Sequence, residues 1–216
     1  MTILLKKIAF ILAVCLTIVI TGCDDKNKSK IHLILLQDNS ESVTNDRELS
    51  RNFLRNCIDT SKIISFYDVM SLMAVNGNSP IAIDAQQAAP KKIKQFCNQT
   101  AQNAPEGTYV CDRLNLSIDL INRSQHIPLL ISQVQVAEKD RSCPQTWLKL
   151  SNLVEERGGK MVILNSSNDA GNKYNQELWS LFNQKDSVKF CSDSRCLKTI
   201  AQQIRQSNSI RTASEQ

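Results

Sequence analysis

Short apolar runs alternate with amphipathic segments through most of the sequence. Residues Ile31–Leu36 form a continuous apolar run, which predicts a strand buried on both faces. Apolar residues then recur at helical spacing between residues 46 and 58, which predicts a helix after that strand. The same alternation continues to residue 204. It predicts a single doubly wound α/β domain over residues 31–204, with a mainly parallel sheet and helices on both faces.

One hairpin is expected within this alternation. Segments 68–75 and 79–84 are separated by a short Asn-Gly-Asn stretch, which predicts a tight turn and therefore one antiparallel strand at the edge of the sheet. The remaining expected elements are helices at 90–97, 109–121, 147–154, 178–182 and 196–204, and strands at 127–136, 161–164 and 188–191. Residues 205–216 are polar and are expected to form a frayed tail.

The first 22 residues are expected to be a signal peptide. Two lysines precede an apolar run over residues 8–20, which is too short to span a bilayer comfortably. The run ends at Ile20-Thr21-Gly22-Cys23, which resembles the lipobox of bacterial lipoproteins. This resemblance implies that Cys23 is lipidated and that residues 23–30 form a short linker to the domain. An uncleaved anchor helix is the alternative.

Charge and the residues after Cys23 bear on where the protein acts. Asp24 and Asp25 resemble the signal that retains lipoproteins in the inner membrane, which implies the periplasmic face of that membrane in a bacterial cell envelope. The formal net charge is +5, and loss of the two lysines of the leader leaves about +3, which is too little to favour nucleic acid as a partner.

The cysteine count favours an oxidising compartment. Apart from Cys15 in the leader and Cys23, six cysteines remain: Cys57, Cys97, Cys111, Cys143, Cys191 and Cys196. Three disulfides are expected, with fifteen pairings open; Cys111 with Cys143 and Cys191 with Cys196 are the two pairs that the sequence suggests. A zinc site is the weaker alternative, because there is no C-x-x-C pair and the sequence has only two histidines.

A D-x-S-x-S pattern, Asp38 to Ser42, follows the first predicted strand directly. Alternate residues of an extended loop point the same way, so one carboxylate and two hydroxyls, from Asp38, Ser40 and Ser42, can converge on a hard cation. The pattern resembles the metal-ion-dependent adhesion site of the von Willebrand factor A family. That resemblance implies a Mg²⁺ or Mn²⁺ site whose open position accepts an acidic side chain of a protein partner. The alternative is that the three residues only cap the next helix.

Two further loops bear on this site. The family supplies a threonine from a Gly-Thr element that opens a helix, and Gly107-Thr108 matches it, which implies that Thr108 is a fourth ligand. The family often has an aspartate after the later strand, where this sequence has Gln133. A glutamine there can hold a water or a hydrogen bond in the second coordination shell but adds no negative charge, so cation affinity should be weaker.

Enzymatic activity and a small-molecule substrate are not expected. The sequence contains no G-x-S-x-G, Walker or G-x-G-x-x-G motif, and His32 and His126 both belong to predicted strands, where a structural role is expected. Two function classes remain. One is an envelope-anchored module that binds a partner protein through Mg²⁺; the other is a metal-independent structural or assembly lipoprotein of an envelope, secretion or conjugation complex.

Overall fold

The computed structural model describes residues 30–77, 82–102, 109–134, 143–164, 180–182, 185–191 and 194–214. They form a six-stranded sheet of order β3-β2-β1-β4-β5-β6. The strands are β1 (Ile31–Gln37), β2 (Val69–Ala74), β3 (Ile83–Gln87), β4 (Ile127–Gln133), β5 (Lys160–Leu164) and β6 (Val188–Cys191). All neighbouring strands pair in parallel except β2 and β3, which are antiparallel. The predicted mainly parallel α/β sheet with one antiparallel edge strand is confirmed.

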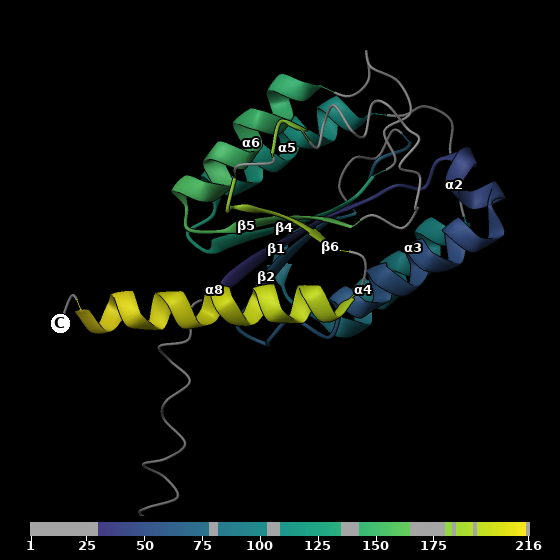
Figure 1. The fold of residues 1–216 in the computed structure, drawn as a ribbon. Helices are drawn as coiled ribbons and strands as arrows, with labels where there is room; N and C mark the ends of the chain where they lie inside the picture. Colours follow the sequence, from purple (N-terminus) through teal and green to yellow (C-terminus); the bar gives the residue numbers. More distant parts are fainter. Residues whose placement is uncertain are drawn as a thin grey trace, which may run out of the picture.

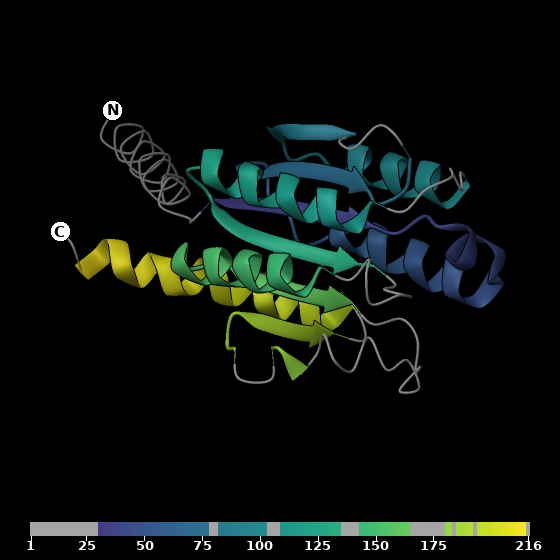
Figure 2. The same cartoon turned by 90° about the horizontal axis from the view of Figure 1, so that it is seen from above.

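Helices cover both faces of this sheet, as Figures 1 and 2 show. They are α2 (Glu41–Asn45), α3 (Arg47–Thr60), α4 (Pro90–Gln102), α5 (Val110–Arg123), α6 (Pro144–Glu156) and α8 (Ser194–Ser214). One core lies between the sheet and α3, α4 and α8, and a second lies between the sheet and α5 and α6. In the described part of the chain, no helix is both long and apolar enough to cross a membrane.

Strand β1 lies at the centre of the sheet, between β2 and β4. All seven of its residues are buried. Leu33 and Leu35 contribute to the core under α3, α4 and α8, whereas Ile34 and Leu36 contribute to the core under α5 and α6. Burial on both faces explains why the apolar run is unbroken. The strand also brings the D-x-S-x-S segment to the carboxyl edge of the sheet.

Two boundaries differ from the sequence-based expectation. The second hairpin strand was expected at 79–84 but is found at Ile83–Gln87, where four of its five residues are exposed. This edge strand pairs on one side only, so burial does not select apolar residues there. The frayed tail expected from residue 205 is also wrong, because α8 continues to Ser214. Arg205 is held by the carbonyl oxygen of Ile63 and by the carboxylate of Asp68.

Three disulfides join the six cysteines of the domain. Cys57–Cys97 links α3 to α4, Cys111–Cys143 links the start of α5 to the residue before α6, and Cys191–Cys196 links the end of β6 to the first turn of α8. The last two are the pairs suggested by the sequence. Because all six thiols are used in these bonds, the structure leaves none of them as zinc ligands.

Candidate functional site

Three strand ends are joined by backbone hydrogen bonds at the carboxyl edge of the sheet. The amide of Asp38 donates to the carbonyl of Gln133 (2.9 Å), and the amide of Val75 donates to the carbonyl of Gln37 (2.9 Å). The amide of Tyr109, just before α5, donates to the carbonyl of Val75 (3.2 Å). The ends of β1, β2 and β4 and the start of α5 therefore meet at one place, and the arrowheads of β1 and β4 point to that edge in Figure 2.

The loop after β1 orients a buried carboxylate. Asp38 is 2% exposed, and its Oδ1 accepts a hydrogen bond from the amide of Ser40 at 2.8 Å. Ser40 precedes α2, but its side chain makes no capping hydrogen bond to that helix. The first long helix, α3, is instead capped by Asp46, whose carboxylate accepts from the amides of Glu48 and Leu49. The hydroxyl of Ser40 therefore does not cap α2, whereas the carboxylate of Asp38 holds the amide of the residue that precedes this helix.

A second set of contacts fixes the neighbouring loop after β2. Asn39 Oδ1 accepts from the amide of Asn76 (3.1 Å). The guanidinium of Arg113 donates through Nε to the carbonyl of Ala74 (2.9 Å) and through Nη2 to the carbonyl of Gly77 (2.7 Å). Burial lowers the pKa of Arg113. These contacts hold the loop after β2 beside the loop after β1.

Asn39, Asn76 and Arg113 were not identified from the sequence. The two asparagines lie in loops and carry no pattern that predicts contact between them. Arg113 does carry a signal, because it is a charged residue at a position of the buried stripe of α5. A buried arginine in a helix stripe requires acceptors, and here two backbone carbonyls supply them.

Gln133 ends β4 directly beside Gln37 in the parallel register. Its side chain is fully buried, and neither its amide oxygen nor its amide nitrogen has a hydrogen-bond partner among the residues that the structure describes. The Oε1 atom of Gln37 is in the same situation. Buried polar atoms normally find partners, so these two amides mark a buried polar position under the loops that carries no charge.

Several predicted site residues lie outside the described part of the chain. These are Cys23, Thr108 with Gly107, and the side chain of Ser42. Tyr109, which follows Thr108, is described and is bonded to Val75. The structure thus brings Asp38, Ser40 and Gln133 to one edge.

The donor set at this edge suits a hard cation. Carboxylate and hydroxyl oxygens are the ligands that Mg²⁺ prefers, and the buried carboxylate of Asp38 is already oriented by its own loop. Over the described ranges, no cluster of three or more His, Cys, Asp or Glu side chains is arranged to hold a metal ion. A site with a single carboxylate is expected to bind divalent cations weakly.

The two histidines lie at the other end of the sheet, near the start of β1 and β4. His32 is buried, its Nε2 is 2.9 Å from Ser71 Oγ, and Ser71 Oγ accepts from the amide of Ala85 (3.0 Å). Burial first, and then the charge of His126, lower the pKa of His32 to about 4. His32 therefore packs inside the domain, in agreement with the structural role predicted for it.

Comparison with known proteins gives likenesses of fold. No protein-family profile matches the chain, and no curated protein sequence matches it. Among solved structures, proximal thread matrix protein 1 from the mussel byssus superposes with a TM-score of 0.59 at 12% identity, over 84% of this chain and 47% of that one. BatB from Bacteroides thetaiotaomicron superposes with a TM-score of 0.55 at 11% identity, over 84% of this chain and 98% of that one.

A third similar structure is a von Willebrand factor type A protein. A von Willebrand factor type A protein from Catenulispora acidiphila superposes with a TM-score of 0.52 at 11% identity, over 84% of this chain and 42% of that one. The chain thus spans less than half the length of the mussel and Catenulispora chains. The structure of the mussel protein has also been solved with zinc in its metal-ion-dependent adhesion site (MIDAS) motif. At these identities the likeness is one of fold: the chain has the fold of a von Willebrand factor A domain.

Proposed function

We propose that this chain is a protein-binding module anchored in the bacterial cell envelope, which engages an acidic residue of its partner through a divalent cation at the carboxyl edge of the sheet. Asp38, Ser40, Ser42 and Thr108 would hold Mg²⁺ or Mn²⁺. Such a cation, when bound, offers an open coordination position to a carboxylate oxygen of the partner. No catalytic step and no small-molecule substrate belong to this proposal.

The observation that carries the proposal is the convergence of the loops after β1, β2 and β4 around Asp38. The carboxylate is buried and held by the amide of Ser40, so little side-chain entropy is left to lose when a ligand binds. Asn39 and Arg113 fix the adjoining loop through backbone groups. The support for a metal-dependent site is therefore an oriented carboxylate beside hydroxyl-bearing residues at a ligand-binding edge.

Gln133 favours the second candidate, a metal-independent structural or assembly lipoprotein. Its amide takes the place where the family often has an aspartate, and both of its polar atoms lack partners among the described residues. A neutral amide leaves the site with less negative charge to attract a cation. In this case the same edge would bind its partner through direct hydrogen bonds and shape complementarity, without a cation.

The anchor and the location are part of the proposal and rest on the sequence. Cys23 follows a lipobox-like motif, and Asp24 and Asp25 come next. A lipid attached at Cys23 would hold the domain at the periplasmic face of the inner membrane.

Calorimetric titration of Mg²⁺ and Mn²⁺ into the full chain in non-ionic detergent tests the metal-dependent candidate. The test variant is Asp38→Asn and the matched control is Asp46→Asn, since both aspartates accept backbone amides at the start of a helix. We expect the wild type and Asp46→Asn to bind the cation and Asp38→Asn to lose binding at least tenfold. Equal binding by all three chains, or none by the wild type, would contradict the metal-dependent candidate.

A further inference from the structure

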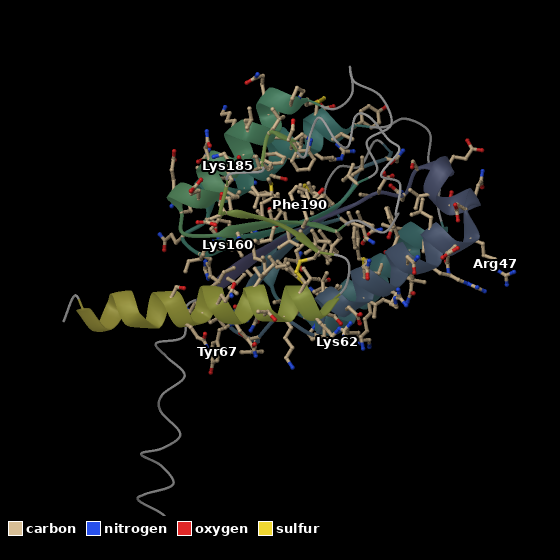
Figure 3. The ribbon with its side chains drawn as sticks, viewed as in Figure 1. Arg47, Lys62, Tyr67, Lys160, Lys185 and Phe190 are labelled. Atoms are coloured by element: carbon tan, nitrogen blue, oxygen red, sulfur yellow. A yellow bond between two sulfur atoms is a disulfide. The ribbon has the colours of Figure 1, made fainter. Side chains whose placement is uncertain are left out.

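Two adjacent aromatic side chains are exposed at the edge of the sheet opposite the candidate site. Phe66 is 71% exposed and Tyr67 is 48% exposed, the highest values for large hydrophobic side chains in the part of the chain that the structure describes. Their rings contact edge to face, with centroids 5.8 Å apart. Figure 3 shows Tyr67 on the side of the molecule away from Arg47, which opens α3 near the carboxyl edge.

The pair occupies the centre of a tight turn that is firmly held. The amide of Asp68 donates to the carbonyl of Ser65 (3.1 Å), and the amide of Ser65 donates back to Asp68 Oδ2 (2.7 Å). Gln87 Nε2 donates to the carbonyl of Phe66 (3.0 Å). Central turn positions usually carry Gly, Asn, Asp or Pro. Here a rigid turn presents two aromatic rings to the outside.

This turn lies where the chain enters the sheet. Asp68 Oδ1 accepts from the amide of Ile31, the first residue of β1 (3.0 Å). Residues 24–30 are all that separate Cys23 from β1. Fully extended, seven residues span at most about 25 Å. A lipid on Cys23 would therefore keep the Phe66–Tyr67 turn close to the bilayer surface.

We propose that Phe66 and Tyr67 insert into the headgroup region of the membrane to which the chain is anchored; this rests on the lipid anchor of the proposed function. Tyrosine, which has an apolar ring and a polar hydroxyl, favours the membrane interface, and phenylalanine adds apolar area that can be buried there. Lys30 is exposed beside the turn and adds a positive charge that anionic lipid attracts. The domain then stands on its amino-terminal edge, and the loops around Asp38 face away from the bilayer, about 23 Å along β1.

Quenching by lipids brominated in their acyl chains tests this orientation. The full lipidated chain is reconstituted into phosphatidylethanolamine–phosphatidylglycerol vesicles with either Phe66→Trp or, as the matched control on the opposite edge, Tyr109→Trp. Tyr109 is 37% exposed. For each variant, the ratio of emission in brominated to unbrominated vesicles is compared with the ratio for the unsubstituted chain. All three chains contain Trp147 and Trp179, so this comparison isolates the emission of the added tryptophan.

We expect the emission added by Phe66→Trp to shift to shorter wavelength and to fall at least twofold in brominated vesicles, with that of Tyr109→Trp unchanged. Flotation of the vesicles separates the possible failures. A chain that floats but shows no quenching at position 66, or equal quenching at both positions, overturns the inference and leaves the anchor intact. A chain that does not float refutes the anchor and the inference together. A shift at position 66 that needs a second protein and no lipid would make the turn a protein contact, and this also overturns the inference.

Discussion

Two buried aspartates, at opposite edges of the sheet, use their carboxylates in different ways. Asp68, at the amino-terminal edge, is 1% exposed and accepts from Ile31 and Ser65 while it pairs with Arg205, 137 positions away in the sequence. Asp38, at the carboxyl edge, is 2% exposed, and its Oδ1 accepts from Ser40 within its own loop. One carboxylate joins distant segments, and the other shapes a loop.

The two edges also differ in their use of disulfides. The amino-terminal edge depends on hydrogen bonds and an ion pair centred on Asp68. At the carboxyl edge, Cys111–Cys143 joins the starts of two helices, and Cys191–Cys196 closes the end of β6. These covalent links add to the hydrogen bonds of Asp38, Asn39 and Arg113 that hold the loops of the carboxyl edge. Both edges contribute to stability, and under the proposed function only the carboxyl edge also binds a cation.

The largest expected effect comes from removing the cross-link of the carboxyl edge. The double variant Cys111→Ala/Cys143→Ala frees a 32-residue loop and should lower the free energy of unfolding by roughly 3–4 kcal/mol. The matched variant Cys191→Ala/Cys196→Ala, which frees only 5 residues, should lose about 2 kcal/mol. Urea denaturation of both chains measures the difference. Equal losses would show that loop entropy does not govern these bonds.

Next in size is loss of the clamp at the amino-terminal edge. Asp68→Ala removes the acceptor of Arg205 Nη2 and of the amides of Ile31 and Ser65 and should cost about 3 kcal/mol in unfolding free energy. Asp84→Ala is the control, because the ion pair of Asp84 with Arg123 is exposed and should contribute less than about 1 kcal/mol. A loss below about 1 kcal/mol for Asp68→Ala would contradict the claim that Asp68 stabilises the amino-terminal edge.

Acid should destabilise the domain through His32, which lies near the amino-terminal edge of the sheet. The pKa of His32 is lowered to about 4 by burial and by the charges of His126 and Arg123, with Asp84 acting in the opposite direction. The unfolded chain, in which the histidine pKa is about 6.5, binds the proton first, so stability is complete above about pH 6.5 and falls as the pH drops toward 4. Between pH 7.5 and 5 the expected loss is about 2 kcal/mol.

Chemical denaturation at several pH values, with His32→Gln beside the wild type, checks this expectation. The variant keeps a polar group near Ser71 but cannot titrate. Its unfolding free energy should depend less on pH over the same window, with the remaining slope carried in part by His126, whose pKa is also lowered by burial. Identical slopes for both chains would mean that His32 does not control the acid response.

The smallest expected effect concerns the affinity of the carboxyl edge for Mg²⁺. Gln133→Asp places a carboxylate at the end of β4 and, under the proposed function, should tighten Mg²⁺ binding about tenfold, or about 1.4 kcal/mol. The buried charge should also lower the melting temperature in EDTA, and Mg²⁺ should recover it. Calorimetry and thermal denaturation with and without Mg²⁺ measure both effects. A melting temperature that Mg²⁺ does not raise would show that position 133 is not part of a cation site.

Much of the architecture could be predicted because burial leaves a pattern in the sequence. The unbroken run at residues 31–36 locates β1, and the glycine at 158, with φ of 69°, ends α6 near the predicted place. Strand β3 was misplaced because an exposed edge strand has no such pattern. The end of α8 was missed because the apolar spacing stops at Ile204, although the helix continues.

The site could be predicted only where its residues are neighbours in sequence. The D-x-S-x-S loop is local, so its place after β1 was visible. The bond between Asn39 and Asn76 spans 37 positions, and the one between Arg205 and Asp68 spans 137. Such pairings depend on how the elements pack. For the same reason the sequence left fifteen disulfide pairings open, and the structure selects one.

Hydrogen exchange of the full chain, with and without saturating Mg²⁺, tests most directly whether the two edges have separate roles. The amides of Asp38, Ser40 and Tyr109 report on the carboxyl edge, and those of Ile31, Ser65 and Asp68 report on the amino-terminal edge. We predict that Mg²⁺ slows exchange at the first set and leaves the second unchanged. Unchanged exchange at both edges, or equal slowing at both, would contradict the account.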